Sequence, residues 1–284
     1  MIERRPLASL LAHVVLVLGV LIVAFPVYLT LVASTQSAQQ IAASHPISLI
    51  PGSHGPATYA RALFGGKNEF GSQLPAVAPM LWTSLISALV IAIGKIAISL
   101  LSAFAIVYFR FPGRGLVFWM IFVTLMLPVE VRIGPTYAVV AELGLLNSYA
   151  GLTVPLIASA TATFLFRQFF LTVPDELVEA ARIDGAGPLR FFKDVLLPLS
   201  VTSIAALFVI QFIYGWNQYL WPLLVTTDES MYPVVMGIKR LIAGEAYTEW
   251  NVVMATAMLA MLPPALVVIV MQKWFVKGLV DTEK

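Results

Sequence analysis

The sequence predicts an all-α membrane protein with six transmembrane helices, and three observations lead to this fold class. Hydrophobic residues make up 60% of the 284 positions and charged residues only 11%, whereas soluble domains have about 45–50% and about 25%. Six segments are apolar over the roughly 20 residues that a helix needs to cross a bilayer. The charged residues fall mostly between these segments. Because unpaired backbone groups are costly in lipid and no barrel-like alternation is present, the segments are expected to be helices.

The predicted spans and the loops between them form a single transmembrane domain over residues 1–284. The first span follows Arg4 and Arg5 and is longer than the core of a signal peptide, so it is expected to remain in the membrane. The predicted spans cover, in order, about 10–33, 80–108, 115–138, 150–170, 200–224 and 252–275.

The distribution of lysine and arginine sets the predicted orientation. With the N-terminus inside, 11 of them lie on the cytoplasmic side and 5 outside, and Lys95 within a span completes the total of 17. Because cytoplasmic loops are enriched in these residues, both termini are expected in the cytoplasm. The loop 171–199 is then cytoplasmic. The loop 34–79, which is rich in proline and glycine, is expected to be extracytoplasmic and largely irregular.

The loop 171–199 holds an unusual cluster of charged residues, and its pattern predicts two short helices around a glycine turn. Thr172 is expected to cap the first helix, with Asp175 three residues further on. Gly185 is expected to end that helix, since glycine adopts the left-handed conformation at little cost. Physical reasoning alone leaves two interpretations open: helices that lie on the membrane surface, or a docking element for another protein.

The same loop resembles the Glu-Ala-Ala motif of permease subunits in bacterial ABC importers. The motif's later glycine and Leu-Pro pair also occur here at the matching spacing. The resemblance implies the type I ABC importer permease fold, located in the bacterial inner membrane, with 171–199 as a cytoplasmic coupling loop that docks in a cleft of an ATPase subunit. The residues to which it gives this ATPase-coupling role are Glu179, Ala180, Ala181, Asp184, Gly185 and Pro198.

The resemblance also implies partners and cofactors. A second permease subunit, a dimer of cytoplasmic ATPase subunits, an extracytoplasmic solute-binding protein and membrane lipid are expected around this chain. No Gly-x-x-x-x-Gly-Lys-Ser/Thr sequence occurs, so ATP and Mg²⁺ are expected to be used by the separate ATPase, and this chain to be non-catalytic and without a cofactor. Cysteine is absent and the 3 histidines are scattered, so no metal site is expected. A net charge of +2 gives no indication of nucleic acid binding.

Further segments narrow the resemblance to one branch of the family. They are similar to carbohydrate-type permeases and, among these, to the second permease of sn-glycerol-3-phosphate importers, and the likeness runs nearly from end to end. It implies import of sn-glycerol-3-phosphate or related glycerophosphodiesters, with neutral sugars or oligosaccharides as the alternative. The segments that carry it are 103–115, 125–133, 159–170 and 212–222.

Three charged residues in or near the spans are candidates for the substrate pathway. Lys95 lies in the middle of a span and Arg132 near the outer end of the third, and ionisable residues at such depth are functional candidates by default. Together they favour an anionic substrate. For Lys95, pairing with a carboxylate of the partner permease and snorkelling are the alternatives. Glu130 does not share a helix face with Arg132, so each needs a partner of its own.

Asn217 is a fourth candidate for the substrate pathway. It lies between Trp216, Tyr219 and Trp221, and aromatic residues at this position are typical of a belt at the membrane interface. A pore-lining role for Asn217 is the alternative.

Two other classes of membrane protein fit the sequence less well. A secondary transporter would need repeat symmetry and broken helices with ion ligands, and it would not need a docking loop. An intramembrane enzyme would need a nucleophile and a base that converge, or a metal cluster, and neither is visible in the spans.

Overall fold

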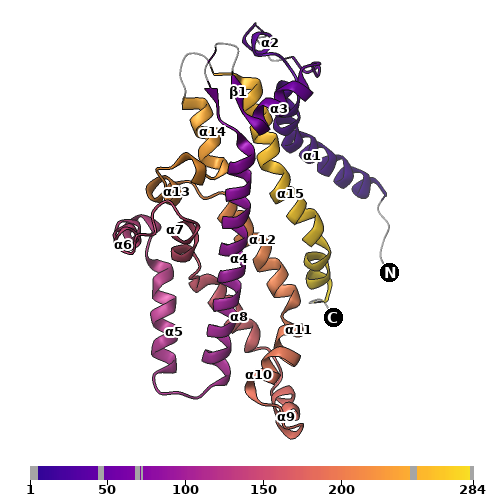
Figure 1. The fold of residues 1–284 in the computed structure, drawn as a ribbon. Coiled ribbons are helices and arrows are strands. Elements are labelled where there is room, and N and C mark those ends of the chain that lie inside the picture. Colours follow the sequence, from indigo (N-terminus) through magenta and orange to yellow (C-terminus); the bar gives the residue numbers. More distant parts are fainter. Residues whose placement is uncertain (1–5, 44–47, 68–70, 72, 244–247, 282–284) are drawn as a thin grey trace. The chain divides into compact units, whose positions relative to one another are not determined.

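The structure is a computed structural model that describes residues 6–43, 48–67, 71, 73–243 and 248–281, and it is almost entirely helical (Figure 1). The helices are α1 (Pro6–Ser34), α2 (Ala38–Ala43), α3 (Gly55–Phe64), α4 (Val77–Tyr108), α5 (Arg114–Val123), α6 (Val129–Glu142), α7 (Tyr149–Thr153), α8 (Ala160–Phe170), α9 (Asp175–Ile183), α10 (Pro188–Phe191), α11 (Leu197–Leu199), α12 (Val201–Trp216), α13 (Leu220–Val225), α14 (Val234–Ala243) and α15 (Trp250–Asp281). A two-stranded antiparallel hairpin joins β1 (Gly66–Lys67) to β2 (Gln73–Leu74). Short 3₁₀ segments cover Thr124–Met126, Val154–Leu156 and Glu229–Met231, and a π-helical segment covers Phe192–Leu196.

Within the described part of the chain, three helices are long and apolar enough to cross a membrane. They are Ser9–Ser34, Val77–Tyr108 and Trp250–Trp274. Two bent pairs bring the number to five if each pair is one span: Tyr149–Leu156 with Ala160–Phe170, bent by 46°, and Pro188–Leu199 with Val201–Trp216, bent by 72°. The count of six spans and the limits of the loops between them stay predictions.

The segment predicted as the third span consists of two helices rather than one. Helix α5 passes into the 3₁₀ turn, Leu127 is extended, and Pro128 is the N-cap of α6. A proline disfavours helical backbone at the residue before it and has no amide hydrogen to donate. The break at Leu127 follows from these two properties.

The segment predicted as the fifth span is also divided, between Trp216 and Leu220. Helix α12 ends at Trp216, and α13 begins at Leu220. Trp221 is buried, and its Nε1 donates a hydrogen bond to the Gly151 carbonyl at 3.0 Å. This hydrogen bond ties α13 to α7.

Contacts divide the chain into two units, and each is described by itself. The first unit combines residues up to Pro79 with Gly237–Leu262, and the second combines Met80–Met236 with the residues from Pro263 onward. In the first unit α3 buries Thr58 and Ala62, and a small core also takes in Val252 and Ala255 at the start of α15. The expectation that 34–79 is largely irregular was therefore wrong. Part of this loop is ordered by its apolar contacts with the start of α15, which is distant in the sequence.

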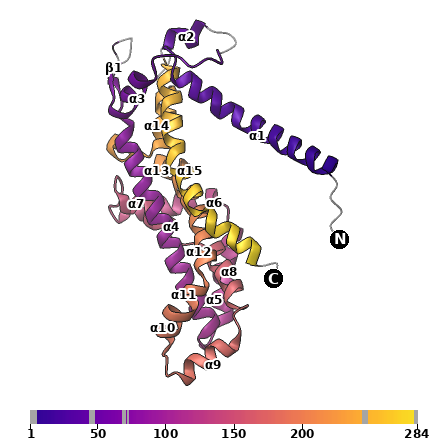
Figure 2. The ribbon, with the colours of Figure 1, turned by 90° about the vertical axis from the view of Figure 1, so that its right-hand side faces the viewer.

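The second unit contains the core that positions the coupling loop. Figures 1 and 2 both show α9, α10 and α11 gathered at the C-terminal end of α4. The buried side chains of this core come from α4, α8, α12 and the coupling loop: Ile96, Leu100, Ala103, Phe104, Ala162, Phe166, Phe170, Ala181, Phe191, Leu196 and Leu207. The loop is thus part of the core of the second unit.

Candidate functional site

The first helix of the coupling loop, α9, begins without a side-chain cap. Its N-cap is Pro174, and the Thr172 hydroxyl donates instead to the Phe169 carbonyl at 2.7 Å. The prediction of a Thr172 cap was wrong, because this hydroxyl bonds back to the turn that ends α8. Asp175 and Glu176 lie in the first turn of α9, where negative charge is favourable to the helix dipole.

Helix α9 ends where the sequence predicts, at a glycine in the left-handed region. Gly185 has φ +69°, its amide donates to the Arg182 carbonyl at 3.0 Å, and the Ala186 amide donates to the Ala181 carbonyl at 2.8 Å. These two bonds are those of a Schellman motif. They fix the direction in which the chain leaves α9, and so set the positions of both loop helices.

The coupling loop has one anchored side and one exposed side. Ala181 and Phe191 are buried in the shared core. The loop also exposes two large apolar side chains, since Ile183 is 86% and Leu189 76% exposed. The other predicted coupling residues, which are all exposed, are Glu179, Ala180, Asp184, Gly185 and Pro198. This arrangement offers apolar and acidic groups to a partner while the helices stay attached to the spans.

Aromatic contacts join the coupling loop to α4. The ring centroids of Phe104 and Phe192 are 4.9 Å apart, and those of Tyr108 and Phe191 are 5.3 Å apart. The Tyr108 hydroxyl donates to the Phe170 carbonyl of α8 at 3.3 Å. A displacement of α9 or α10 therefore meets packed side chains of α4 and α8, which is the physical requirement for coupling.

Lys95 lies deep in the second unit with two uncharged partners. Its side chain is buried, its Nζ donates to Gln211 Oε1 at 3.1 Å, and Nζ lies 3.7 Å from the centroid of the Tyr214 ring. Both partners belong to α12. Lys95 takes no part in the ion pairs Arg61–Glu249 and Arg190–Asp194. An amide and an aromatic face hold this ammonium without neutralising its charge.

The sequence contains a signal for these two partners. Gln211 is the polar residue in an otherwise apolar run from Ala205 to Ile213, and Tyr214 follows it by three residues on the same helix face. A polar residue inside a predicted span needs a partner, and Lys95 was the charged residue in another span.

The other three candidates occupy different surroundings. Arg132 is exposed on α6. Asn217 is exposed at the end of α12. The side chain of Glu130 is not among those that the structure describes. Within the described part of the chain, no hydrogen bond or ion pair joins Arg132 or Asn217 to Lys95.

Two of the aromatic residues that flank Asn217 are buried. Trp216 is 2% and Trp221 is 4% exposed. Trp216 stacks on Phe212 with ring centroids 5.8 Å apart, and Trp221 makes the hydrogen bond to Gly151. The interpretation of these two tryptophans as an interfacial belt was wrong, because contacts within the protein take up both rings.

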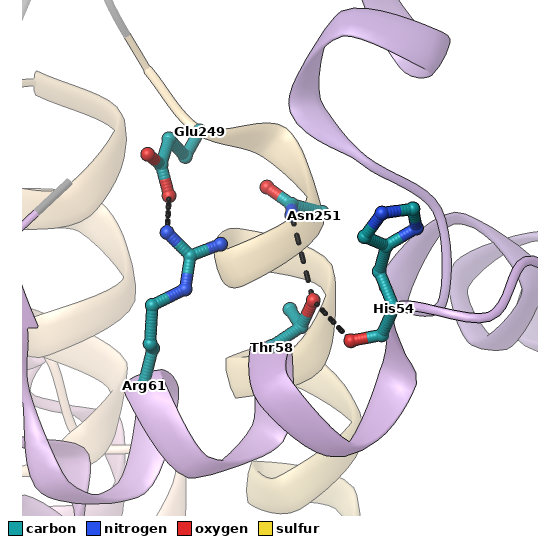
Figure 3. Close-up of polar contacts among 5 residues, drawn as sticks. All are labelled: His54, Thr58, Arg61, Glu249 and Asn251. Carbon is teal, nitrogen blue, oxygen red and sulfur yellow. Dashed lines mark hydrogen bonds and ion pairs between the residues drawn. The ribbon is translucent and has the colours of Figure 1, made fainter. Parts of the chain in front are cut away.

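A polar cluster that the sequence did not indicate lies in the first unit (Figure 3). Arg61 Nη1 lies 3.0 Å from Glu249 Oε2. Asn251 Nδ2 donates to the Thr58 hydroxyl at 3.5 Å, and that hydroxyl donates to the His54 carbonyl at 3.0 Å. These bonds tie α3 to the beginning of α15, and no local pattern marks residues so far apart in sequence as neighbours.

Comparison with known proteins identifies a family that matches this chain. The family described as binding-protein-dependent transport system inner membrane component matches residues 95–281, which include Lys95 and the whole coupling loop.

Relatives of the chain match it over its full length. The sn-glycerol-3-phosphate transport system permease protein UgpE of Agrobacterium fabrum is 62% identical over 286 residues. The proteins of the same name from Brucella melitensis and Escherichia coli are 61% and 57% identical. Each alignment covers 100% of both chains.

A solved structure shows the same fold. The crystal structure of a bacterial ABC transporter involved in the import of the acidic polysaccharide alginate matches with a TM-score of 0.77, and the match covers 97% of this chain and 99% of that one. At a sequence identity of 22%, this match supports a shared fold and nothing further. The chain has the type I ABC importer permease fold, and it belongs to the family of binding-protein-dependent transport system inner membrane components.

Proposed function

We propose that the chain is a permease subunit of an ATP-driven importer that carries sn-glycerol-3-phosphate into the cytoplasm. The observation that carries the proposal is the full-length similarity to permeases named for this substrate, at 57–62% identity. Such identity over 100% of both chains includes the spans as well as the coupling loop.

The charge around Lys95 supports an anionic substrate. Its ammonium is buried against Gln211 and Tyr214, which carry no opposing charge, and Arg132 is a second cation in the same unit. A charge inside a membrane protein is costly and is retained where it serves a function. A phosphate that passes these cations would offset part of that cost, so the positive field lowers the barrier for an anion. Glu130 and Asn217 remain candidates for the same pathway.

ATP would act through the coupling loop from a separate ATPase dimer that uses ATP and Mg²⁺. This proposal is supported by the exposed Glu179, Ile183 and Leu189 on one side of the loop and by its aromatic packing onto α4 on the other. If nucleotide binds best to the state in which two such loops are drawn together, it shifts the permease pair towards that state. A second permease and an extracytoplasmic solute-binding protein complete this importer.

The orientation follows the distribution of positive charge. We place the coupling loop and both termini in the cytoplasm and the loop 34–79 outside, in a bacterial inner membrane. Cysteine substitutions at the exposed Lys67 and Lys193 test this topology, because a membrane-impermeant thiol reagent applied to intact spheroplasts should label only the first. Labelling of the second alone would reverse the orientation.

Transport by the reconstituted importer tests the function. The two permeases, the ATPase and the binding protein are placed in proteoliposomes, and uptake of radiolabelled sn-glycerol-3-phosphate, a glycerophosphodiester and a neutral disaccharide is measured with ATP inside. We expect ATP-dependent uptake of the phosphorylated solutes only. Uptake of the disaccharide alone would support the neutral-sugar alternative.

Copurification separates the importer from a secondary transporter. A tagged copy of this chain, extracted in mild detergent, should bring down an ATPase subunit and a second permease. Uptake driven by an ion gradient, with no ATPase recovered, would contradict the proposal.

A further inference from the structure

We propose that the ends of α4 and α8 and the start of α5 form a binding site for the phosphate head group of an anionic phospholipid. A pocket of about 380 Å³ lies there, entirely within the second unit, and Arg114 and Arg167 contribute to its lining. None of the described residues that line it is acidic. The pocket therefore has two cations and no anion of its own.

Arg167 is held in the pocket in a way that leaves hydrogen-bonding capacity unused. The carbon of its guanidinium group lies 4.1 Å from the centroid of the Phe118 ring of α5. Its Nε is buried and has no hydrogen-bond acceptor in the described parts of the chain. A buried donor without an acceptor is costly. Guanidinium groups bind phosphate oxygens through paired N–H bonds, so a phosphate is well suited to accept from this donor.

The walls of the pocket favour a lipid over a free phosphate ion. Ile106, Val107 and Leu171 are aliphatic, and Trp119 is 59% exposed beside them. A free phosphate gains nothing from these side chains, whereas the glycerol backbone and the first acyl carbons of a lipid can pack against them. Basic pockets between spans on the cytoplasmic side are places where anionic head groups bind, and this end of α4 is the one predicted to be cytoplasmic.

The helices around the pocket are packed against each other, so the pocket is a defined part of the fold. Phe122 of α5 and Phe164 of α8 have ring centroids 5.7 Å apart. Leu171, which lines the pocket, is the C-cap of α8 and lies four residues before α9 begins at Asp175. A bound head group would therefore brace the base of the coupling loop.

Native mass spectrometry of the intact importer in detergent tests this site. Phosphatidylglycerol and phosphatidylcholine of the same chain length are titrated, and soluble glycerophosphoglycerol provides the head group without a membrane anchor. We expect tight binding of phosphatidylglycerol, with little competition from the soluble head group. Arg114→Gln and Arg167→Gln should each weaken the binding of phosphatidylglycerol about five-fold, and the double variant about twenty-five-fold. A factor of about five is what one basic residue contributes near an anionic lipid surface.

Arg110→Gln is the matched control. Arg110 is also exposed and lies four residues before Arg114, but it does not line the pocket, so its loss should leave binding of phosphatidylglycerol unchanged. Arg114→Gln alters an exposed residue, so it tests the pocket even if replacement of Arg167 prevents assembly. Equal binding of the two lipids, or an equal effect of Arg110→Gln, would overturn the proposal. Full competition by the soluble head group would assign the pocket to a free phosphate ester instead.

Discussion

Arg61 of α3 and Glu249 next to α15 are 188 positions apart in the sequence, yet Arg61 Nη1 and Glu249 Oε2 are separated by 3.0 Å. The Glu249 side chain is only 1% exposed, and that of Arg61 is 28% exposed. A carboxylate buried to this degree depends on the groups that compensate its charge. The pair therefore links the order of the loop 34–79 to the position of the last long helix.

Arg61→Met should destabilise the first unit by about 3 kcal/mol, because it removes the guanidinium partner of a buried carboxylate. The measurement is the midpoint of thermal unfolding of the purified importer. Lys67→Met is the control, since Lys67 is an exposed cation in the same loop. Equal midpoints for the two variants would show that the ion pair contributes little.

Gly185→Ala should loosen the end of α9, whereas Gly187→Ala should not. Both glycines are exposed, and a Cβ added at either would meet no other atom within 4 Å, but Gly185 has φ +69° and Gly187 has φ −70°. The left-handed conformation costs a non-glycine residue about 1–2 kcal/mol. Amide exchange at Ala186, which donates to the Ala181 carbonyl, should therefore become faster by about five-fold or more in the first variant only.

This glycine shows why local features were predictable from the sequence. Gly185 ends α9 through its own backbone freedom and two nearby hydrogen bonds, so a short window of sequence contains the cause. The break in the predicted third span also has a local cause, the ring of Pro128, although this span was predicted as one segment. The general fold class also depends on composition, which needs no knowledge of contacts.

Features that depend on distant partners were not predictable. Trp221 is buried in a core with Val140 and Leu152 and bonds to Gly151, whereas a window around Trp221 shows only an aromatic cluster. Lys95 could be singled out as a charge in a span, but its partner Gln211 comes from another helix. The ordering of α3 by Glu249 needs the same long-range information. A single sequence therefore shows which residues are candidates, but not which residues they contact.

Glu179→Arg should abolish substrate-stimulated ATP hydrolysis while the membrane subunits stay assembled. Glu179 is exposed on α9, so charge reversal disturbs no packed neighbour and acts on whatever docks there. The measurement is ATP hydrolysis by the reconstituted importer with and without loaded binding protein. Glu142→Arg makes the same charge change at an exposed position at the end of α6 and should leave the stimulation intact. Normal stimulation in the Glu179 variant would refute the coupling role.

Lys95→Met should reduce uptake of sn-glycerol-3-phosphate by about tenfold, the effect of about 1.4 kcal/mol on the barrier. The substitution keeps an unbranched side chain, one atom shorter, and removes the positive charge that Gln211 and Tyr214 leave unneutralised. Uptake is measured in proteoliposomes, and assembly is measured by the amount of second permease and ATPase that copurifies.

Gln211→Leu separates a transport role of Lys95 from a structural one. It removes the amide partner but keeps the ammonium, so the field along the pathway remains while the contact between α4 and α12 is weakened. If Lys95 only stabilises this contact, both variants should lower assembly to the same extent, and uptake per assembled complex should be unchanged. If Lys95 acts on the substrate, only Lys95→Met should lower uptake per complex, because only this variant removes the ammonium.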